Sequence, residues 1–290
     1  MIGWLYLAAA VAGGVALWPL GRWAMQKDGQ ATILGFWISL TGGVLGLSLV
    51  ILLGRPLVVW PVWGAGLAFG VAYAVGFCML IMHCLKIGPA GPTVTINNMA
   101  MVCGVLYGAL WLKPHPLHPS AVLGVAGTCV ALLLLGKARP SQEVGTPGVN
   151  PRWLKLVMAG GAFSGLSFIT QTHVGVLYVE HSFLFVSTGF FISALILLPG
   201  MLRARGSFGH RRERTAGLGI GSVNALLGPV GLAAMHHVGA EVMLPVSLVT
   251  PIVVMLLVGH FAYRERLDRL GWAGSLAGLA SVALLALGSS

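Results

Sequence analysis

Hydrophobic residues run along the chain in ten long segments that are separated by short polar breaks. The segments are continuous and show no period-2 alternation of the kind that marks membrane-spanning strands. Most are close to the ~20 residues that a helix needs to cross the hydrocarbon layer of a membrane. The pattern predicts transmembrane helices near residues 4–24, 31–53, 60–83, 89–112, 119–136, 153–177, 183–202, 216–236, 241–262 and 270–288.

The two halves of the chain resemble each other at an offset of 151 residues. Adding 151 to Gly66 and Gly70 gives Gly217 and Gly221, and other small residues in the third and fourth segments repeat in the same way. Each half contains an odd number of segments, so the halves must cross the membrane in opposite directions. We predict an all-α membrane protein with two inverted five-helix repeats, residues 1–137 and 152–290, joined by a linker loop over 138–151.

Positive charge is distributed unequally between the two sets of loops. If ten helices cross the membrane, 15 of the 17 Lys and Arg residues lie on one side, and only Arg55 and Lys113 lie on the other. Lys and Arg are enriched in cytoplasmic loops, so the count predicts that both termini lie outside the cytoplasm. The net charge of +10 therefore indicates membrane orientation and not nucleic-acid binding.

Composition supports the same class. Hydrophobic residues make up 57% of the chain and charged residues 8%, with a mean hydropathy of +0.90, whereas soluble domains carry about 25% charged residues. The four cysteines fall in or beside apolar segments and are interpreted as buried hydrophobic residues. The first segment has no positively charged region before it and is interpreted as a retained helix. We expect an integral protein of a bacterial inner (plasma) membrane.

Two adjacent amides, Asn97 and Asn98, interrupt the fourth apolar segment. Placing an unpaired amide in lipid costs roughly several kcal/mol of free energy. Each of the two asparagine side chains must therefore face protein or a water-filled cavity. Adjacent helical positions point about 100° apart, so one amide is expected to line a cavity while the other bonds a neighbouring helix. We predict that Asn97 and Thr93 face the cavity, although interhelical bonding by Asn97 stays an alternative.

Further polar and aromatic side chains are candidates for a substrate site. Tyr73 and Asn224 occupy matched positions in the two halves, which suits a site that holds an apolar body on one side and a polar group on the other. Close packing is the alternative for their helices, because glycines four residues apart permit it. The predicted substrate-binding residues are Trp18, Tyr73, Thr93, Asn97, Gln171, Asn224, Ser247 and Thr250.

Several chemistries have no residues to support them in the sequence. No Asp or Glu falls in the middle of a segment, which argues against a cation exporter with a membrane carboxylate. A nucleotide-binding loop of the form GxxxxGK[ST] is missing, and no metal-ligand or nucleophile constellation is recognisable. We expect no cofactor, no metal and no enzymatic activity.

The C-terminal stretch "PVSLVTPIVVMLLVGHFAYRERLDRLGWAGSLAGLASVALLALG" combines Pro251, the turn residue Glu265 and a glycine-rich last segment. With the two-repeat pattern, it resembles the EamA-type transporters of the drug/metabolite transporter superfamily. The first half departs from that pattern, because its corresponding turn has Pro114 where the glutamate would stand. The resemblance implies ten spans and transport. Family members are commonly drawn with cytoplasmic termini, opposite to the orientation that the charge count predicts.

The sequence thus predicts a secondary transporter that moves a small neutral or zwitterionic metabolite, such as an amino acid, by alternating access. Export is implied only by the resemblance. Expected partners are the substrate and the lipid bilayer, with no nucleic acid, and the protein is a monomer or a homodimer. Two alternatives stay open: a flippase or membrane enzyme acting on an amphiphile, with an apolar lateral opening, and a scaffold with a dry interior.

Overall fold

The computed structural model describes residues 2–25, 29–87, 97–112, 119–137, 151–204, 209–250 and 269–288. Within these ranges the chain is helical and contains no strand. Residues 97–99 and 240–250 are also helical. The other elements are α1 (Ile2–Ala24), α2 (Ala31–Leu52), α3 (Trp60–Ala72), η1 (Tyr73–Ile81), α4 (Met82–Ile87), α6 (Met101–Tyr107), η2 (Gly108–Leu112), α7 (Pro119–Lys137), α8 (Pro151–Leu177), η3 (Val179–His181), α9 (Ser182–Arg203), α10 (Arg211–Val238) and α12 (Arg269–Gly288).

Helices occupy all ten predicted apolar segments, although the fourth and ninth segments are described only in part. Five stretches of the described residues are long and apolar enough to cross a membrane: Ala31–Leu52, Trp60–Cys84, Pro151–Leu177, Val179–Arg203 and Arg211–Val238. Shorter apolar helices cover Ile2–Val15, Asn97–Leu112, Val122–Ala131 and Ala240–Thr250. The predicted all-α membrane class is therefore confirmed.

The third predicted segment is not one regular helix. It begins as α3, widens into the π-helix η1 at Tyr73 and returns to α-helix in α4. Hydrogen bonds in a π-helix join residues five apart instead of four, and such turns often occur at functional sites. The widening changes the direction in which side chains beyond Tyr73 project.

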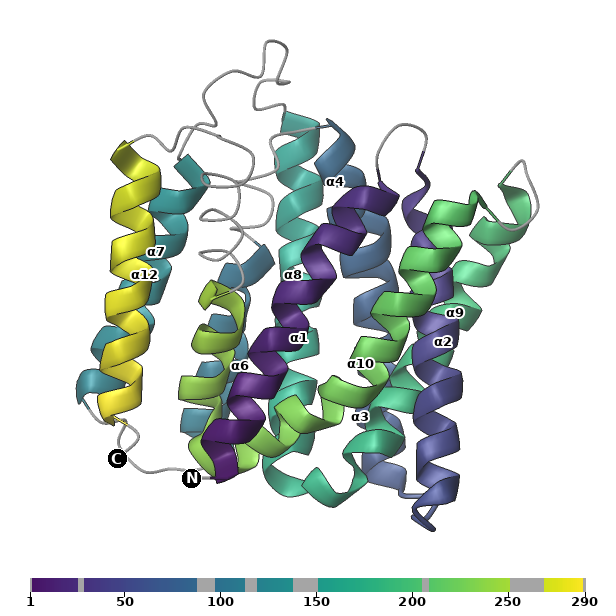
Figure 1. The fold of residues 1–290 in the computed structure, drawn as a ribbon, viewed down its shortest axis with the longest axis horizontal. Helices are drawn as coiled ribbons and strands as arrows, with labels where there is room; N and C mark the ends of the chain where they lie inside the picture. Colours follow the sequence, from purple (N-terminus) through teal and green to yellow (C-terminus); the bar gives the residue numbers. More distant parts are fainter. Residues whose placement is uncertain are drawn as a thin grey trace.

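The helices associate in pairs that join the first half of the chain to the second. α2 packs on α9, α1 and α2 pack on α10, and α3 packs on both α8 and α9. α7 and α12 pack against each other at the edge opposite to α2 and α9, and α1 begins at the same end of the molecule at which α12 finishes (Figure 1).

The helix boundaries repeat at the offset found in the sequence. Adding 151 to the bounds of α2 gives the bounds of α9, and adding 151 to the range 60–87 gives that of α10. The glycine contacts repeat in the same way. A β-carbon built on Gly70 would lie 2.7 Å from Cβ of Ile192, and one built on Gly221 would lie 2.7 Å from Cβ of Thr41. The two contacts are equivalent at this offset. Gly221 corresponds to Gly70, and Ile192 corresponds to Thr41, since the residue numbers in each pair differ by 151.

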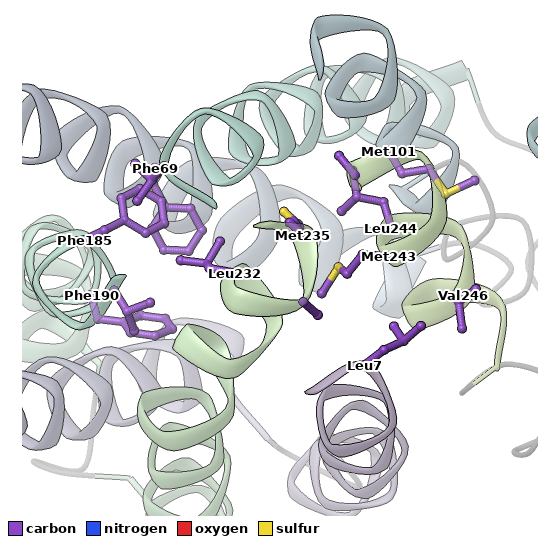
Figure 2. Close-up of a cluster of buried hydrophobic side chains, with 14 of the residues drawn as sticks. Leu7, Phe69, Met101, Phe185, Phe190, Leu232, Met235, Met243, Leu244 and Val246 are labelled. Carbon is purple, nitrogen blue, oxygen red and sulfur yellow. The ribbon is translucent and has the colours of Figure 1, made fainter. Parts of the chain in front are cut away.

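The interior holds a large cluster of apolar side chains from both halves. Phe185, Met101, Met235 and Leu244 are each buried to 2% exposure or less, and Figure 2 shows Leu244 beside Met101. Polar bonds cross the α2–α9 contact within this interior. Ser39 and Ser193 share a hydrogen bond of 2.9 Å, and Ser187 donates to the carbonyl of Gly43 at 2.9 Å.

Glu213 is a buried carboxylate, with 1% of its surface exposed, in the first turn of α10. Its Oε2 accepts a 2.7 Å hydrogen bond from the backbone N–H of His210, in a capping-box arrangement. Its Oε1 accepts from the backbone N–H of Gln30, just before α2. The side chain thus ties the start of α10 to the start of α2.

Some sequence predictions fall outside the described residues. The linker 138–151 is one of them, apart from Pro151, which begins α8. Most of the motif that carries the family resemblance, residues 251–268, also lies outside the described residues.

All four cysteines are free. Cys78 and Cys84 are buried as predicted, but Cys103 is exposed on the surface of α6.

Candidate substrate cavity between the two halves

A cavity of about 310 Å³ lies between helices of both halves. This volume is at the lower end of the range for small-molecule sites. Its lining combines amides, hydroxyls and aromatic rings. The residues are Phe69, Tyr73, Phe77, Asn97, Asn98, Ser164, Ser167, Phe168, Gln171, Phe185, Val186, Phe190, Asn224, Gly228, Leu232 and Leu248.

Four of the eight predicted site residues meet at this cavity: Tyr73, Asn97, Gln171 and Asn224. Tyr73 and Asn224 each lie near the middle of their element, the first in the helical run 60–87 and the second in α10. Since their numbers differ by 151, matched positions of the two halves contribute an aromatic ring and an amide to one space.

The other four predicted residues do not line the cavity in the described part of the chain. Thr93 and the side chain of Trp18 lie outside the described residues. Ser247 and Thr250 are half-buried on the helix over 240–250 and are not among the lining residues. The hydroxyl of Ser247 donates to the carbonyl of Leu244 at 3.1 Å, so it is satisfied within its own helix.

Asn97 and Asn98 both line the cavity, whereas the sequence led us to expect only one of them there. The helical turn over 97–99 ends at Ala100, where the backbone N–H bonds the carbonyl of Asn97 at 3.3 Å. Both residues lie within that turn, so positions about 100° apart on one helix both border a cavity that several helices form. The side-chain amide of Asn97 also contacts the oxygen of Asn98 at 3.4 Å.

Asn97 has a second contact, because the hydroxyl of Ser164 on α8 donates to its side-chain oxygen at 2.6 Å. The two roles considered for Asn97, cavity lining and interhelical bonding, therefore occur in one side chain. Gln171 and Asn224 differ from it: neither amide has a hydrogen-bond partner among the described residues.

Sequence reasoning missed several lining residues. Ser164 and Ser167 precede Gln171 on α8 at spacings that place all three on one helical face, and this polar stripe could have been recognised. Phe185 and Phe190 gave no such signal, since phenylalanine in an apolar segment also suits lipid or core. Figure 2 shows Phe69, Phe185 and Phe190 on neighbouring helices beside Leu232.

The lining contains no Asp, Glu, Lys, Arg or His side chain among the described residues. The described part of the chain also holds no group of three or more His, Cys, Asp or Glu residues that could bind a metal. The cavity can therefore offer hydrogen bonds and aromatic surfaces, but no formal charge from these side chains.

An all-helical membrane protein with such a cavity between its two halves has the form of a small-molecule transporter. Residues 151–287 match the model of the EamA-like transporter family. The match covers 137 of the 290 residues, and the matched family is part of the drug/metabolite transporter superfamily. The match indicates a membrane transporter of that superfamily's type.

The fold as a whole also has a counterpart among solved structures. A crystal structure described only as that of a protein aligns with 98% of this chain and 96% of its own chain, with a TM-score of 0.72. The two sequences are 18% identical, so the likeness concerns the fold alone. No curated protein matches the chain by sequence.

Proposed function

We propose that the protein is a secondary transporter that carries a small neutral or zwitterionic metabolite, such as an amino acid, through the cavity between its halves. The proposal rests mainly on the lining, because side chains from the first half and the second half border one space of about 310 Å³. A site shared by both halves can open to either side of the membrane when one half moves against the other.

We further propose ten membrane-spanning helices arranged as two inverted repeats. The support is that helix bounds and glycine contacts recur at an offset of 151 residues. The contact of Gly70 with Ile192 joins first half to second, and its counterpart, Gly221 with Thr41, joins second half to first. Such an exchange of halves is what a two-fold relation between repeats produces.

The lining also bears on the alternative functions. A scaffold with a dry interior requires paired amides, but Gln171 and Asn224 have no partner among the described residues and face the cavity. A flippase requires a lipid-accessible apolar groove, whereas six of the lining residues are Asn, Gln or Ser. Both features favour a water-soluble metabolite. Export, the direction implied by the family, is part of the proposal.

A thermal-shift screen of the purified protein against neutral and zwitterionic metabolites tests the proposal, because ligands of the folded state raise its apparent stability. Each stabilising compound is then followed into proteoliposomes. We expect uptake that Asn224→Leu reduces at least tenfold and that Leu226→Ala, on the exposed side of the same helix, leaves unchanged. Uptake equal in both variants would remove the cavity from the transport route.

A further inference from the structure

The cavity has an aromatic wall that is formed mainly by one ladder of rings. Tyr73 stacks between Phe69, at a centroid distance of 5.8 Å and an interplanar angle of 28°, and Phe77, at 5.3 Å and 22°. Phe190 meets the edge of Tyr73 at 5.3 Å and 85°, and Phe185 contacts Phe69 at 5.1 Å. Because Phe69, Tyr73 and Phe77 stack on one another, this wall meets the cavity mainly with ring edges.

The π-helix keeps this ladder on one face. Residues four apart on an α-helix drift by about 40° around the axis, so three rings at positions 69, 73 and 77 would begin to spiral away from the cavity. The ladder changes from α3 to η1 at Tyr73, and the wider turn rotates Phe77 back. The backbone irregularity thus keeps the three rings in contact with one another along one wall.

The polar part of the described lining is uncharged. Asn97, Asn98 and Gln171 project from the first half and α8, and Asn224 projects from α10. A side-chain amide offers a donor and an acceptor side by side. Because Gln171 and Asn224 bond no described residue, their donors and acceptors are available to a ligand.

The absence of charged side chains from the described lining limits what can bind. A buried carboxylate or ammonium group without an opposite charge is strongly disfavoured. A zwitterionic amino acid would bring both groups into this space, and a nucleotide would bring phosphates. A molecule with no net or local formal charge avoids that desolvation cost.

We infer that the transported molecule is an uncharged, flat heteroaromatic ring whose edge carries adjacent hydrogen-bond donors and acceptors, which is the chemistry of a nucleobase. The ring would pack on the aromatic wall formed by Tyr73 and its neighbours, and its edge would pair with Gln171 and Asn224. Aromatic contacts combined with hydrogen bonds to the base edge are how proteins hold unpaired bases. This inference rests on the proposed function, because it concerns the same cavity.

Binding to the purified full-length protein tests the inference, with uracil and adenine as probes and phenylalanine and leucine as comparison ligands. We expect at least one base to raise the melting temperature, with an affinity at least tenfold higher than that of either amino acid. Tighter binding of phenylalanine or leucine, or binding of neither base, would overturn the inference.

Variants then locate the bound base. Tyr73→Phe keeps the ring and should keep affinity within about threefold, whereas Tyr73→Leu and Asn224→Leu should each weaken it at least tenfold. Met79→Leu, on the exposed surface of η1, serves as the control. If Tyr73→Leu fails to fold, Phe77→Leu removes the next ring of the same wall. Base affinity unchanged in the folded wall variant or in Asn224→Leu contradicts this mode of binding.

The experiments distinguish a failure of this inference from a failure of the proposed function. Should both bases fail while another metabolite is transported and Asn224→Leu abolishes its transport, the inference is wrong and the transport cavity stands. If transport of every substrate found is insensitive to Asn224→Leu, both are wrong.

Discussion

The hydroxyl of Ser164 on α8 donates a 2.6 Å hydrogen bond to the side-chain oxygen of Asn97, and both side chains face the cavity. An amide in an apolar helix is tolerated here because one of its groups is bonded to a neighbouring helix. The same side chain borders the space in which a substrate would lie, so stability and transport depend on it together.

Asn97→Leu is therefore expected to lower both properties. Removing the acceptor leaves the Ser164 hydroxyl unsatisfied, which costs about 1–3 kcal/mol of stability, and leucine also narrows the cavity. Transport should fall at least tenfold. The matched control is Ser193→Ala, which removes the 2.9 Å bond to Ser39 away from the cavity. Ser193→Ala should lower the melting temperature without changing substrate affinity. Normal transport by folded Asn97→Leu would exclude Asn97 from the substrate site.

The glycine contacts predict a paired loss of stability. In Gly70→Ala the new methyl group would collide with Ile192 and the carbonyl of Gly189, and in Gly221→Ala it would lie 2.6 Å from the carbonyl of Ile38. Each change should cost about 1–3 kcal/mol through overpacking. Gly64→Ala meets nothing within 4 Å and should be neutral or slightly stabilising. Thermal unfolding of all three in one detergent provides the comparison, and equal melting temperatures would refute the close packing.

Glu213 should matter for stability although it lies away from the cavity. In Glu213→Gln the amide nitrogen must face one of two backbone N–H groups, that of Gln30 or that of His210. One donor is then left unsatisfied, at a cost of about 1–3 kcal/mol. Glu180→Gln is the control, since the Glu180 side chain is 66% exposed and surface changes stay within about 0.5 kcal/mol. A drop in melting temperature that is no larger for Glu213→Gln would argue against this tether.

The charge distribution predicts the membrane orientation, which two introduced cysteines can measure. Arg55→Cys lies in the loop between α2 and α3, and Arg203→Cys ends α9; both positions are exposed. An impermeant maleimide should label the first in intact cells and the second only after permeabilisation. The parent protein corrects for labelling of Cys103 and Cys129. The reverse pattern would place both termini in the cytoplasm.

The sequence predicts the helices well because a membrane requires long apolar segments, and the glycines at 66, 70, 217 and 221 reveal the offset between halves. The sequence predicts the cavity in part, because an amide in an apolar helix must face either protein or a water-filled cavity. Asn97 was predicted by that argument, and Tyr73 and Asn224 by their matched positions in the two halves; all three line the cavity.

The remainder depends on packing. The stretch beginning at Tyr73 has the same apolar character in an α-helix or a π-helix, so nothing in it predicts η1. Phe185 and Phe190 become a cavity wall only because α9 is rotated by its contacts with α2 and α3. Ser247 is satisfied by its own helix, which residue type alone does not distinguish from a ligand contact.

The central claim is that a water-filled space between the halves carries the substrate. Asn224→Cys and Leu226→Cys, reconstituted in liposomes and treated with a small water-soluble methanethiosulfonate, test it without knowledge of the substrate. Asn224 lines the cavity, and Leu226 is 52% exposed on the outer side of α10. We predict modification of Asn224→Cys at least tenfold faster than that of Leu226→Cys, above the parent's background. Equal rates, or no reaction of Asn224→Cys, would contradict the account.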